Sequence, residues 1–185
     1  MKSLRTVGTC LVIVLSLASC ANELKHRELS SAEVPYDYDV PTGAEVSHEL
    51  FQEPRIGTTY YLTEVSTAED LTLIFKIDTP ANRVLVKSSP AEDAGNWIHD
   101  GEVSWMGVET SRSTGAGYMQ VQPYRIHQDQ ASCVAVQSFA KPTFDDSLRE
   151  LYHESLIAIR CHEGQEPVSS AQLNDMLTRL KGEGR

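Results

Sequence analysis

From residue 56 onward, short runs of β-forming residues alternate with turn residues, and this texture limits the folds that the chain can adopt. The clearest run is residues 71–77. There Leu71, Leu73, Phe75 and Ile77 fall at every second position, so they share one face of a strand. Similar runs are residues 57–65, 83–87, 102–110, 118–126, 132–139 and 155–162. The pattern predicts an antiparallel meander sheet of about six to seven strands.

Three connections between these runs carry expectations of their own. Residues 79–82 include Pro80 and favour a turn, so residues 83–87 should pair back on the preceding strand as a hairpin. Residues 112–117 contain two glycines and predict a hairpin loop. Residues 145–153 predict a helical turn or two.

The end of the chain predicts an amphipathic helix. Ser169 and Gln172 have the spacing of a capping box, and Gly182 is a natural stop. A helix this short is marginal alone, so we expect it to pack on one face of the sheet. The fold class is therefore α+β, and the alternative is a sheet that closes on itself. The apolar stripe of the helix consists of Leu173, Met176, Leu177 and Leu180.

The N-terminus has the pattern of an export signal. Lys2 and Arg5 provide a basic start, and residues 10–17 form an apolar stretch that is too short to cross a membrane as a helix. The small residues Ala18 and Ser19 end the segment. These features are typical of a signal peptide that is removed from the mature protein.

The sequence Leu-Ala-Ser-Cys at residues 17–20 resembles the lipobox of bacterial lipoproteins. The resemblance covers residues 1–20 and implies cleavage before Cys20, diacylglycerol on the Cys20 sulfur and acylation of the new amino group. Two or three acyl chains would anchor the protein stably. Because Ala21 rather than Asp follows the cysteine, the resemblance implies the outer membrane, facing the periplasm.

These observations divide the chain into three parts. Residues 1–19 are the expected lipoprotein signal peptide, residues 20–55 a lipidated N-terminus and polar tether, and residues 56–185 a single α+β domain. The tether is broken by prolines and shows no lasting apolar pattern, with one short ordered piece expected near residues 46–51, so it would let the domain sit tens of Å from the bilayer. Residues 34–41 are acidic and aromatic, and form either an extended linker or a segment that binds a partner or a cation.

The net charge excludes one class of partner. The chain has a formal charge of −10, and removal of residues 1–19 takes away the positive charges of Lys2 and Arg5 and leaves −12. A protein this acidic repels phosphate backbones, so we expect no nucleic-acid binding. Attachment to a membrane should therefore depend on lipid at the N-terminus.

Two cysteines remain for a structural role after Cys20 is lipidated. Cys133 and Cys161 form an even pair in an oxidising compartment, which predicts a disulfide between neighbouring strands or across a layer. The alternatives are a metal site with His162 and His153, or free or intermolecular thiols. Adjacent residues of a strand point to opposite faces, so Cys161 and His162 are poorly placed as ligands of one metal.

Motifs that would identify an enzyme are missing from the sequence, which has no His-Glu-x-x-His, Gly-x-Ser-x-Gly, Walker or Cys-x-x-Cys pattern. We therefore predict no catalytic residue, metal or cofactor. One candidate binding loop contains His99 and Asp100 between Trp97 and Trp105, which could line a small cleft. The alternative is that both tryptophans pack on the core and that His99 is solvated.

These inferences predict a membrane-anchored envelope lipoprotein with a non-enzymatic accessory, scaffold or binding role, and an envelope protein as its partner. One alternative is an anchored hydrolase or glycan-binding module that uses the loop of Trp97 and Trp105. Another is a pilotin-like assembly chaperone for an outer-membrane component, which would need an apolar groove or an unpaired strand edge.

Overall fold

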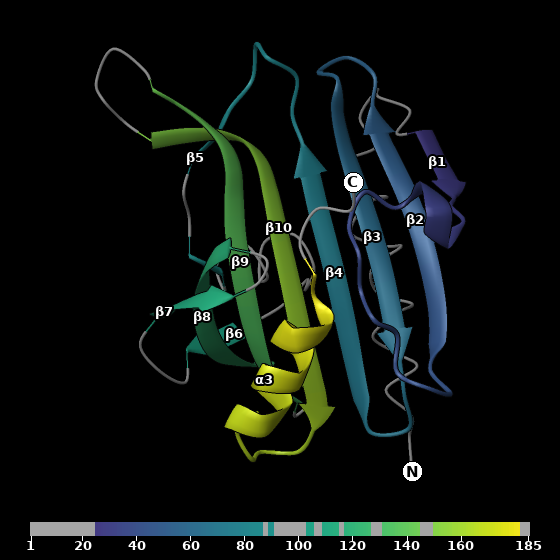
Figure 1. Cartoon of the computed structure of the whole chain (residues 1–185), viewed down its shortest axis with the longest axis vertical. Coiled ribbons are helices and arrows are strands. Elements are labelled where there is room, and N and C mark those ends of the chain that lie inside the picture. Colours follow the sequence, from purple (N-terminus) through teal and green to yellow (C-terminus); the bar gives the residue numbers. More distant parts are fainter. Residues whose placement is uncertain are drawn as a thin grey trace.

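The computed structural model describes residues 25–86, 89–90, 103–105, 109–114, 117–126, 131–144 and 150–181. Within these residues, ten strands form one antiparallel sheet and a single α-helix packs on one face (Figure 1). The strands are β1 (Lys25–Glu28), β2 (Glu45–Glu53), β3 (Thr58–Ser66), β4 (Asp70–Asp78), β5 (Leu85–Val86), β6 (Val103–Trp105), β7 (Thr110–Thr114), β8 (Gly117–Ile126), β9 (Ala131–Phe144) and β10 (Glu150–Glu163). The helices are the 3-10 turn η1 (Ser31–Glu33) and α3 (Ser170–Arg179). The predicted α+β class and the helix on one face are confirmed, with more strands than expected.

The sheet has the strand order β1-β2-β3-β4-β10-β9-β8-β6. Two meanders, β1 to β4 and β8 to β10, meet where the last strand, β10, pairs with β4. β5 and β7 extend this path by pairing with β10 and β8. The described strands leave β1 and β6 at opposite ends of the order, so this sheet is open rather than closed on itself.

The predicted hairpin at residues 83–87 is wrong. A turn does form, since the Arg83 amide donates to the Pro80 carbonyl at 2.9 Å. After it, however, β5 pairs with Leu151 and Tyr152 of β10, on the side where β4 pairs further along. β5 therefore continues the line of β4 after a short excursion. The residue pattern cannot reveal this, because both arrangements need the same turn.

The other two predicted connections fared differently. β7 and β8 pair as a hairpin, with Thr114 opposite Gly117, so the predicted hairpin is confirmed, while residues 112–114 and Gly117 belong to its strands rather than to its loop. The helical turn expected at residues 145–153 is wrong for residues 150–153, which belong to β10. Leu151 and Tyr152 pair there with β9 on one side and with the distant β5 on the other, and this pairing overrides their helical preference. Residues 145–149 lie outside the described residues.

The predicted polar tether is wrong for residues 25–55. β1 and β2 are full members of the sheet, with Lys25 opposite Gln52 and Glu53 opposite Thr58. The segment between them folds onto the sheet, where Tyr36 is 5% exposed. Since β2 lies near the edge of the sheet, it buries only Leu50 and Phe51, and this explains why its sequence is so polar.

The sheet has two apolar faces. We call one the α3 face, where residues of the helix and Tyr36 pack on Ile74, Val134 and Ala158. We call the other the disulfide face, where Cys133 and Cys161 lie among large apolar side chains of the strands. The largest contributors to the disulfide face are Phe51, Leu62, Leu71, Leu73, Phe75, Ile77, Tyr124, Ile126, Ile157 and Ile159.

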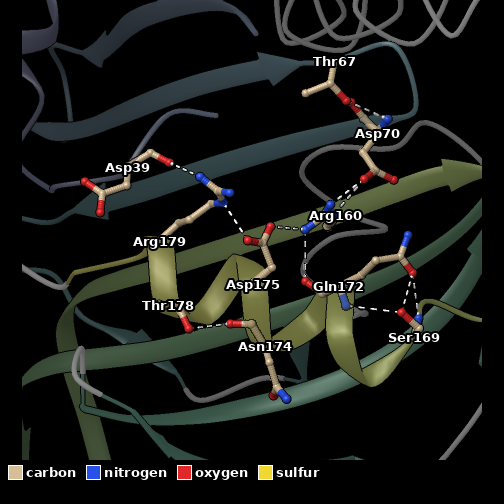
Figure 2. Close-up of polar contacts among 10 residues, drawn as sticks. All are labelled: Asp39, Thr67, Asp70, Arg160, Ser169, Gln172, Asn174, Asp175, Thr178 and Arg179. Atoms are coloured by element: carbon tan, nitrogen blue, oxygen red, sulfur yellow. Dashed lines mark hydrogen bonds and ion pairs between the residues drawn. The ribbon is translucent and has the colours of Figure 1, made fainter. Parts of the chain in front are cut away.

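The helix α3 follows its sequence signals closely. The Gln172 amide donates to the Ser169 hydroxyl, and the Gln172 side chain accepts from the Ser169 amide, which completes the predicted capping box (Figure 2). Leu173, Met176 and Leu177 are buried against the sheet. The chain leaves the helix at Leu180, which forms an isolated β-bridge with Tyr38.

Candidate functional site

Cys133 and Cys161 are the predicted site residues that the structure brings together. They face each other in register across β9 and β10, with their Cα atoms 4.1 Å apart, and their sulfurs form a disulfide. Both side chains are buried in the disulfide face. His162 lies on the opposite face of the strand, and no group of three His, Cys, Asp or Glu within the described residues could hold a metal ion. The pair is therefore a structural staple.

Most of the other predicted site residues lie in parts of the chain that the structure does not describe. Cys20, Trp97, His99 and Asp100 lie outside the described residues. Trp105 ends β6, in register with Tyr124 of β8. The binding loop therefore stays a prediction.

One end of the sheet lies close to Cys20 along the chain. We call it the Lys25 end. Here β1 begins, residues 53–57 turn from β2 to β3, and residues 79–84 link β4 to β5, all at the upper end in Figure 1. The two connections touch, because a Cβ added at Gly57 would meet the Pro80 side chain at 3.3 Å. Lys25 is five residues from Cys20 in the sequence, with only residues 21–24 between them.

The exposed side chains of the Lys25 end are basic and apolar. Lys25, Arg55 and Arg83 are exposed, and Glu53 is the half-buried acid beside them. Val84 and Val86 are 41% and 66% exposed, which is unusual for large apolar side chains. This composition contrasts with the acidic charge of the whole chain.

A buried charge cluster lies just below this end, on the α3 face. Lys76 Nζ lies 3.4 Å from Asp78 Oδ1 and 3.5 Å from Glu154 Oε2. Lys76 and Glu154 are both almost fully buried. The ammonium lies between two carboxylates, so the three groups have a formal net charge of −1, which lies below the surface because Lys76 and Glu154 are buried.

The opposite end of the sheet is acidic, and we call it the Glu69 end. It contains the turn from β3 to β4 and the connection from β10 to α3. Two cations described here are already held by hydrogen bonds. Arg125 donates to the Gln165 carbonyl at 2.7 Å, and Arg160 donates to Asp70. The exposed acids of this end are Glu45, Glu69, Glu163 and Glu166.

Arg160 connects the Glu69 end to the helix. Its guanidinium donates to Asp70 of β4, to the Gln172 carbonyl at 3.0 Å and to Asp175 at 2.9 Å (Figure 2). Although burial opposes the charge, the hydrogen bonds and charges of Asp70 and Asp175 keep the pKa of Arg160 raised. Arg179 extends the network, because it donates to Asp175 and to the Asp39 carbonyl. This network fixes α3 and the residues before β2 to the sheet.

A chain of hydroxyl groups and one imidazole lies where η1 meets β2. Ser31 Oγ is 3.1 Å from His48 Nε2, and His48 Nδ1 is 2.7 Å from Thr63 Oγ1. The buried Tyr36 hydroxyl donates to Thr63 Oγ1 at 2.7 Å and also lies 3.2 Å from the Ile74 carbonyl oxygen. Burial lowers the pKa of His48, so the neutral ring is favoured. Sequence reasoning missed this site, because its members are up to 32 residues apart from Ser31 to Thr63 and match no motif.

The disulfide face holds one acid in an unfavourable position. Glu64 of β3 is half-buried, and burial together with the nearby Glu49 raises the pKa of its carboxyl. His26 Nε2 lies 3.3 Å from Glu49 Oε2. His26 also stacks on Phe51, with 4.7 Å between ring centroids.

Comparisons with protein-family models, with curated protein sequences and with solved structures return no match for this chain. Among the residues that the structure describes, no helix is both long and apolar enough to cross a membrane.

Proposed function

We propose that this chain is a lipid-anchored bacterial envelope lipoprotein with a non-enzymatic accessory, scaffold or binding role. In this proposal residues 1–19 are removed, Cys20 carries the lipid, and Ala21 directs the protein to the periplasmic side of the outer membrane. The protein partner belongs to the envelope. The proposal begins with the lipobox-like residues 17–20.

The disulfide is the observation that carries this proposal furthest. Cys133 and Cys161 pair directly across β9 and β10, where a disulfide needs no rearrangement of the sheet. Such bonds persist in oxidising compartments and are rare where thiols are kept reduced. The pair therefore supports export, which the lipobox-like sequence suggests independently.

A non-enzymatic role agrees with how the polar groups are used. The Arg160 network joins α3 to the sheet, and Lys76 lies between Asp78 and Glu154 below the surface. With Cys20 near the Lys25 end, the Glu69 end would point away from the membrane. A partner in the periplasm would then meet an acidic surface, which favours a partner with basic side chains.

Cys20→Ser tests the anchor. We expect this variant to lose palmitate labelling and to leave the membrane fraction, whereas Cys10→Ser, which alters the other N-terminal cysteine, keeps both properties. Labelling and fractionation that survive Cys20→Ser would show that the protein is not a lipoprotein.

The binding role is tested by crosslinking in intact cells from probes at Glu69 and Glu166. Repeated failure to recover an envelope protein would count against it.

A second candidate function is ester hydrolysis at Ser31. The specific observation is the 3.1 Å distance between Ser31 Oγ and His48 Nε2, with the other ring nitrogen positioned by Thr63. Ser31 Oγ would attack the ester carbonyl carbon while its proton passes to Nε2, which then delivers it to the departing alcohol. Water would release the acyl group by the same route. This candidate ranks second because Ser31 is exposed, where water weakens electrostatic stabilisation of a transition state.

A fluorophosphonate probe distinguishes the two candidates. If Ser31 is a nucleophile, the probe should label the protein, and Ser31→Ala and His48→Gln should abolish labelling. Ser47→Ala, which changes an exposed serine of β2, is the matched control. An unlabelled parent protein would eliminate the hydrolase.

A pilotin-like chaperone role receives less support from the sheet edges. β1 is only four residues long, and all four of its side chains are polar or charged. Short, charged outer strands are typical of edges that resist strand addition.

A further inference from the structure

We infer that the Lys25 end of the sheet lies on the phospholipid surface that holds Cys20, with its basic side chains on anionic headgroups and Val84 and Val86 at the headgroup boundary. The inference rests on the proposed lipidation of Cys20. It goes further because it names the surface of the domain that meets the membrane and the chemistry of that contact.

Chain length is the first argument. Five Cα-to-Cα steps separate Cys20 from Lys25, and a fully extended chain covers at most about 17 Å in that number of steps. β1 begins at Lys25 and is fixed to β2 in register. The domain therefore cannot move far from the bilayer, in contrast to the long tether that the sequence predicts.

Direction is the second argument. β1 runs from the Lys25 end, so the lipidated residue enters the domain from that side. The turn at residues 53–57 follows Gln52, the register partner of Lys25, and its Gly57 contacts Pro80 of the next connection. Residues 53–57 and 79–86 are consequently the parts of the described sheet that lie nearest to the lipid.

Charge complementarity is the third argument. The mature chain has a net charge of −12, yet the exposed charged side chains of β1's first residue and of residues 53–57 and 79–86 are the cations Lys25, Arg55 and Arg83, while Glu53 is half-buried. Glu23, in the link to Cys20, offsets one of these charges. Four exposed acids, Glu45, Glu69, Glu163 and Glu166, lie at the other end of the sheet. Cations attract anionic lipid within about a Debye length, roughly 8 Å at physiological ionic strength. A domain whose cations face the bilayer is therefore attracted to anionic headgroups.

Exposed apolar side chains give the fourth argument. Val86 is 66% exposed and Val84 is 41% exposed, on the same connection as Arg83. Ile56 is half-buried in the neighbouring turn beside Arg55. Basic and apolar side chains next to one another suit the boundary between headgroups and acyl chains, where each kind finds its own environment.

Hydrogen exchange on the full processed protein tests this inference. The protein is reconstituted in vesicles of phosphatidylethanolamine and phosphatidylglycerol, and in vesicles of phosphatidylcholine alone. Palmitate labelling and flotation are checked first, so a failure of anchoring is recognised separately. We expect residues 53–57 and 79–86 to exchange about tenfold more slowly on the anionic vesicles. Residues 67–70 and 164–169, at the Glu69 end, should exchange equally on both.

Two variants sharpen the test. Arg55→Glu combined with Arg83→Glu should remove the slower exchange, whereas Lys181→Glu, an exposed cation near the end of α3, should leave it intact. A flexible insertion of about 20 residues after Ala21 should weaken the protection while lipidation persists. Exchange of the control segments reports whether each variant is folded.

Three outcomes would overturn the inference while the lipoprotein proposal stands. In the first, the protein is labelled and bound, but exchange at residues 53–57 and 79–86 is the same on both kinds of vesicle. In the second, protection appears in native envelope fragments and not on protein-free vesicles, which assigns the surface to a protein. In the third, protection increases with the density of protein on the vesicles, which assigns it to a second copy of this chain.

Discussion

The two faces of the sheet contain apolar clusters of similar character, but they differ in what the described chain places on them. On the α3 face, Leu173, Met176, Leu177 and Tyr36 come from outside the strands. On the disulfide face, the described residues of the cluster all belong to strands, and a disulfide crosses two of them. One face is therefore held by packing of a helix and an ion network, and the other by a covalent bond. Alternation along a strand predicts both faces and does not indicate which kind of support each receives.

Large-to-small substitutions in the two apolar clusters should have the largest effect on stability and test whether both faces are packed cores. Ile157 on the disulfide face and Met176 on the α3 face are both fully buried. We expect Ile157→Ala and Met176→Ala each to lower the free energy of unfolding by about 2–5 kcal/mol, because each leaves a cavity. Urea denaturation measures both. A loss below about 1 kcal/mol for Ile157→Ala alone would mean that the disulfide face is not a packed core.

Removal of the disulfide should take away the covalent support of the disulfide face and so lower the stability of the protein. The bond closes a loop between residues separated by 28 positions, so Cys133→Ser combined with Cys161→Ser should cost about 3.6 kcal/mol of unfolding free energy. Thermal denaturation with and without reductant gives the control. The reductant should lower the melting temperature of the parent protein and leave that of the double variant unchanged. Equal sensitivity of the two proteins would contradict the assignment.

On the α3 face, the corresponding support is Arg160. Arg160→Met should lower the free energy of unfolding by about 1.5–3 kcal/mol, since Asp70 and Asp175 lose charged hydrogen bonds. Arg179→Met removes a more exposed pair with Asp175 and should cost less than about 1 kcal/mol. If the two variants lose the same stability in urea denaturation, Arg160 is not the residue that fixes the helix.

Acid should weaken the α3 face through His48. Burial lowers the pKa of His48 below its ordinary value of 6.5, so the unfolded chain binds more protons than the folded one just below that pH. Stability should be constant above pH 6.5 and fall as the pH drops through the lowered pKa. His48→Gln should remove this slope from a series of urea denaturation curves. An unchanged slope would assign the effect to another group.

Glu64, on the disulfide face, should make stability depend on pH in the opposite direction, and we expect this effect to be the smallest. Because burial raises the pKa of Glu64 above its ordinary value of 4.5, the folded state binds more protons just above that pH. Its contribution to stability is present below pH 4.5 and is lost as the pH rises through the raised pKa. Glu64→Gln should therefore be more stable than the parent at neutral pH. A less stable variant would show that the carboxylate makes a favourable contact.

Features with local causes could be predicted from the sequence. The cap and the apolar stripe of α3 lie within twelve residues, from Ser169 to Leu180, so reading them needs no knowledge of the sheet. The alternation of β4 is equally local, and Leu71, Leu73, Phe75 and Ile77 do share one face. The disulfide could be predicted because only two cysteines remained to pair after Cys20 and the signal segment were set aside.

Features with distant causes were missed. β2 resembles a linker in sequence because most of its side chains remain partly exposed near the sheet edge, and β1 is polar throughout. β5 could not be separated from a hairpin strand because its partner, β10, lies more than sixty residues further along the chain. The same limitation hid the Lys25 end, whose cations Lys25, Arg55 and Arg83 come from separate segments.

The position of β10 has a consequence for how the protein is made. It is the last of the described strands along the chain but lies between β4 and β9 in the sheet. A chain that emerges N-terminus first therefore holds the β4 edge unpaired until β10 has been synthesised. Cys133 likewise has no Cys161 with which to form a disulfide until that point. Pairing over such separations is slow and leaves hydrophobic strand edges open to aggregation. Truncation before Glu150 would thus remove a central strand of the sheet and not merely its edge.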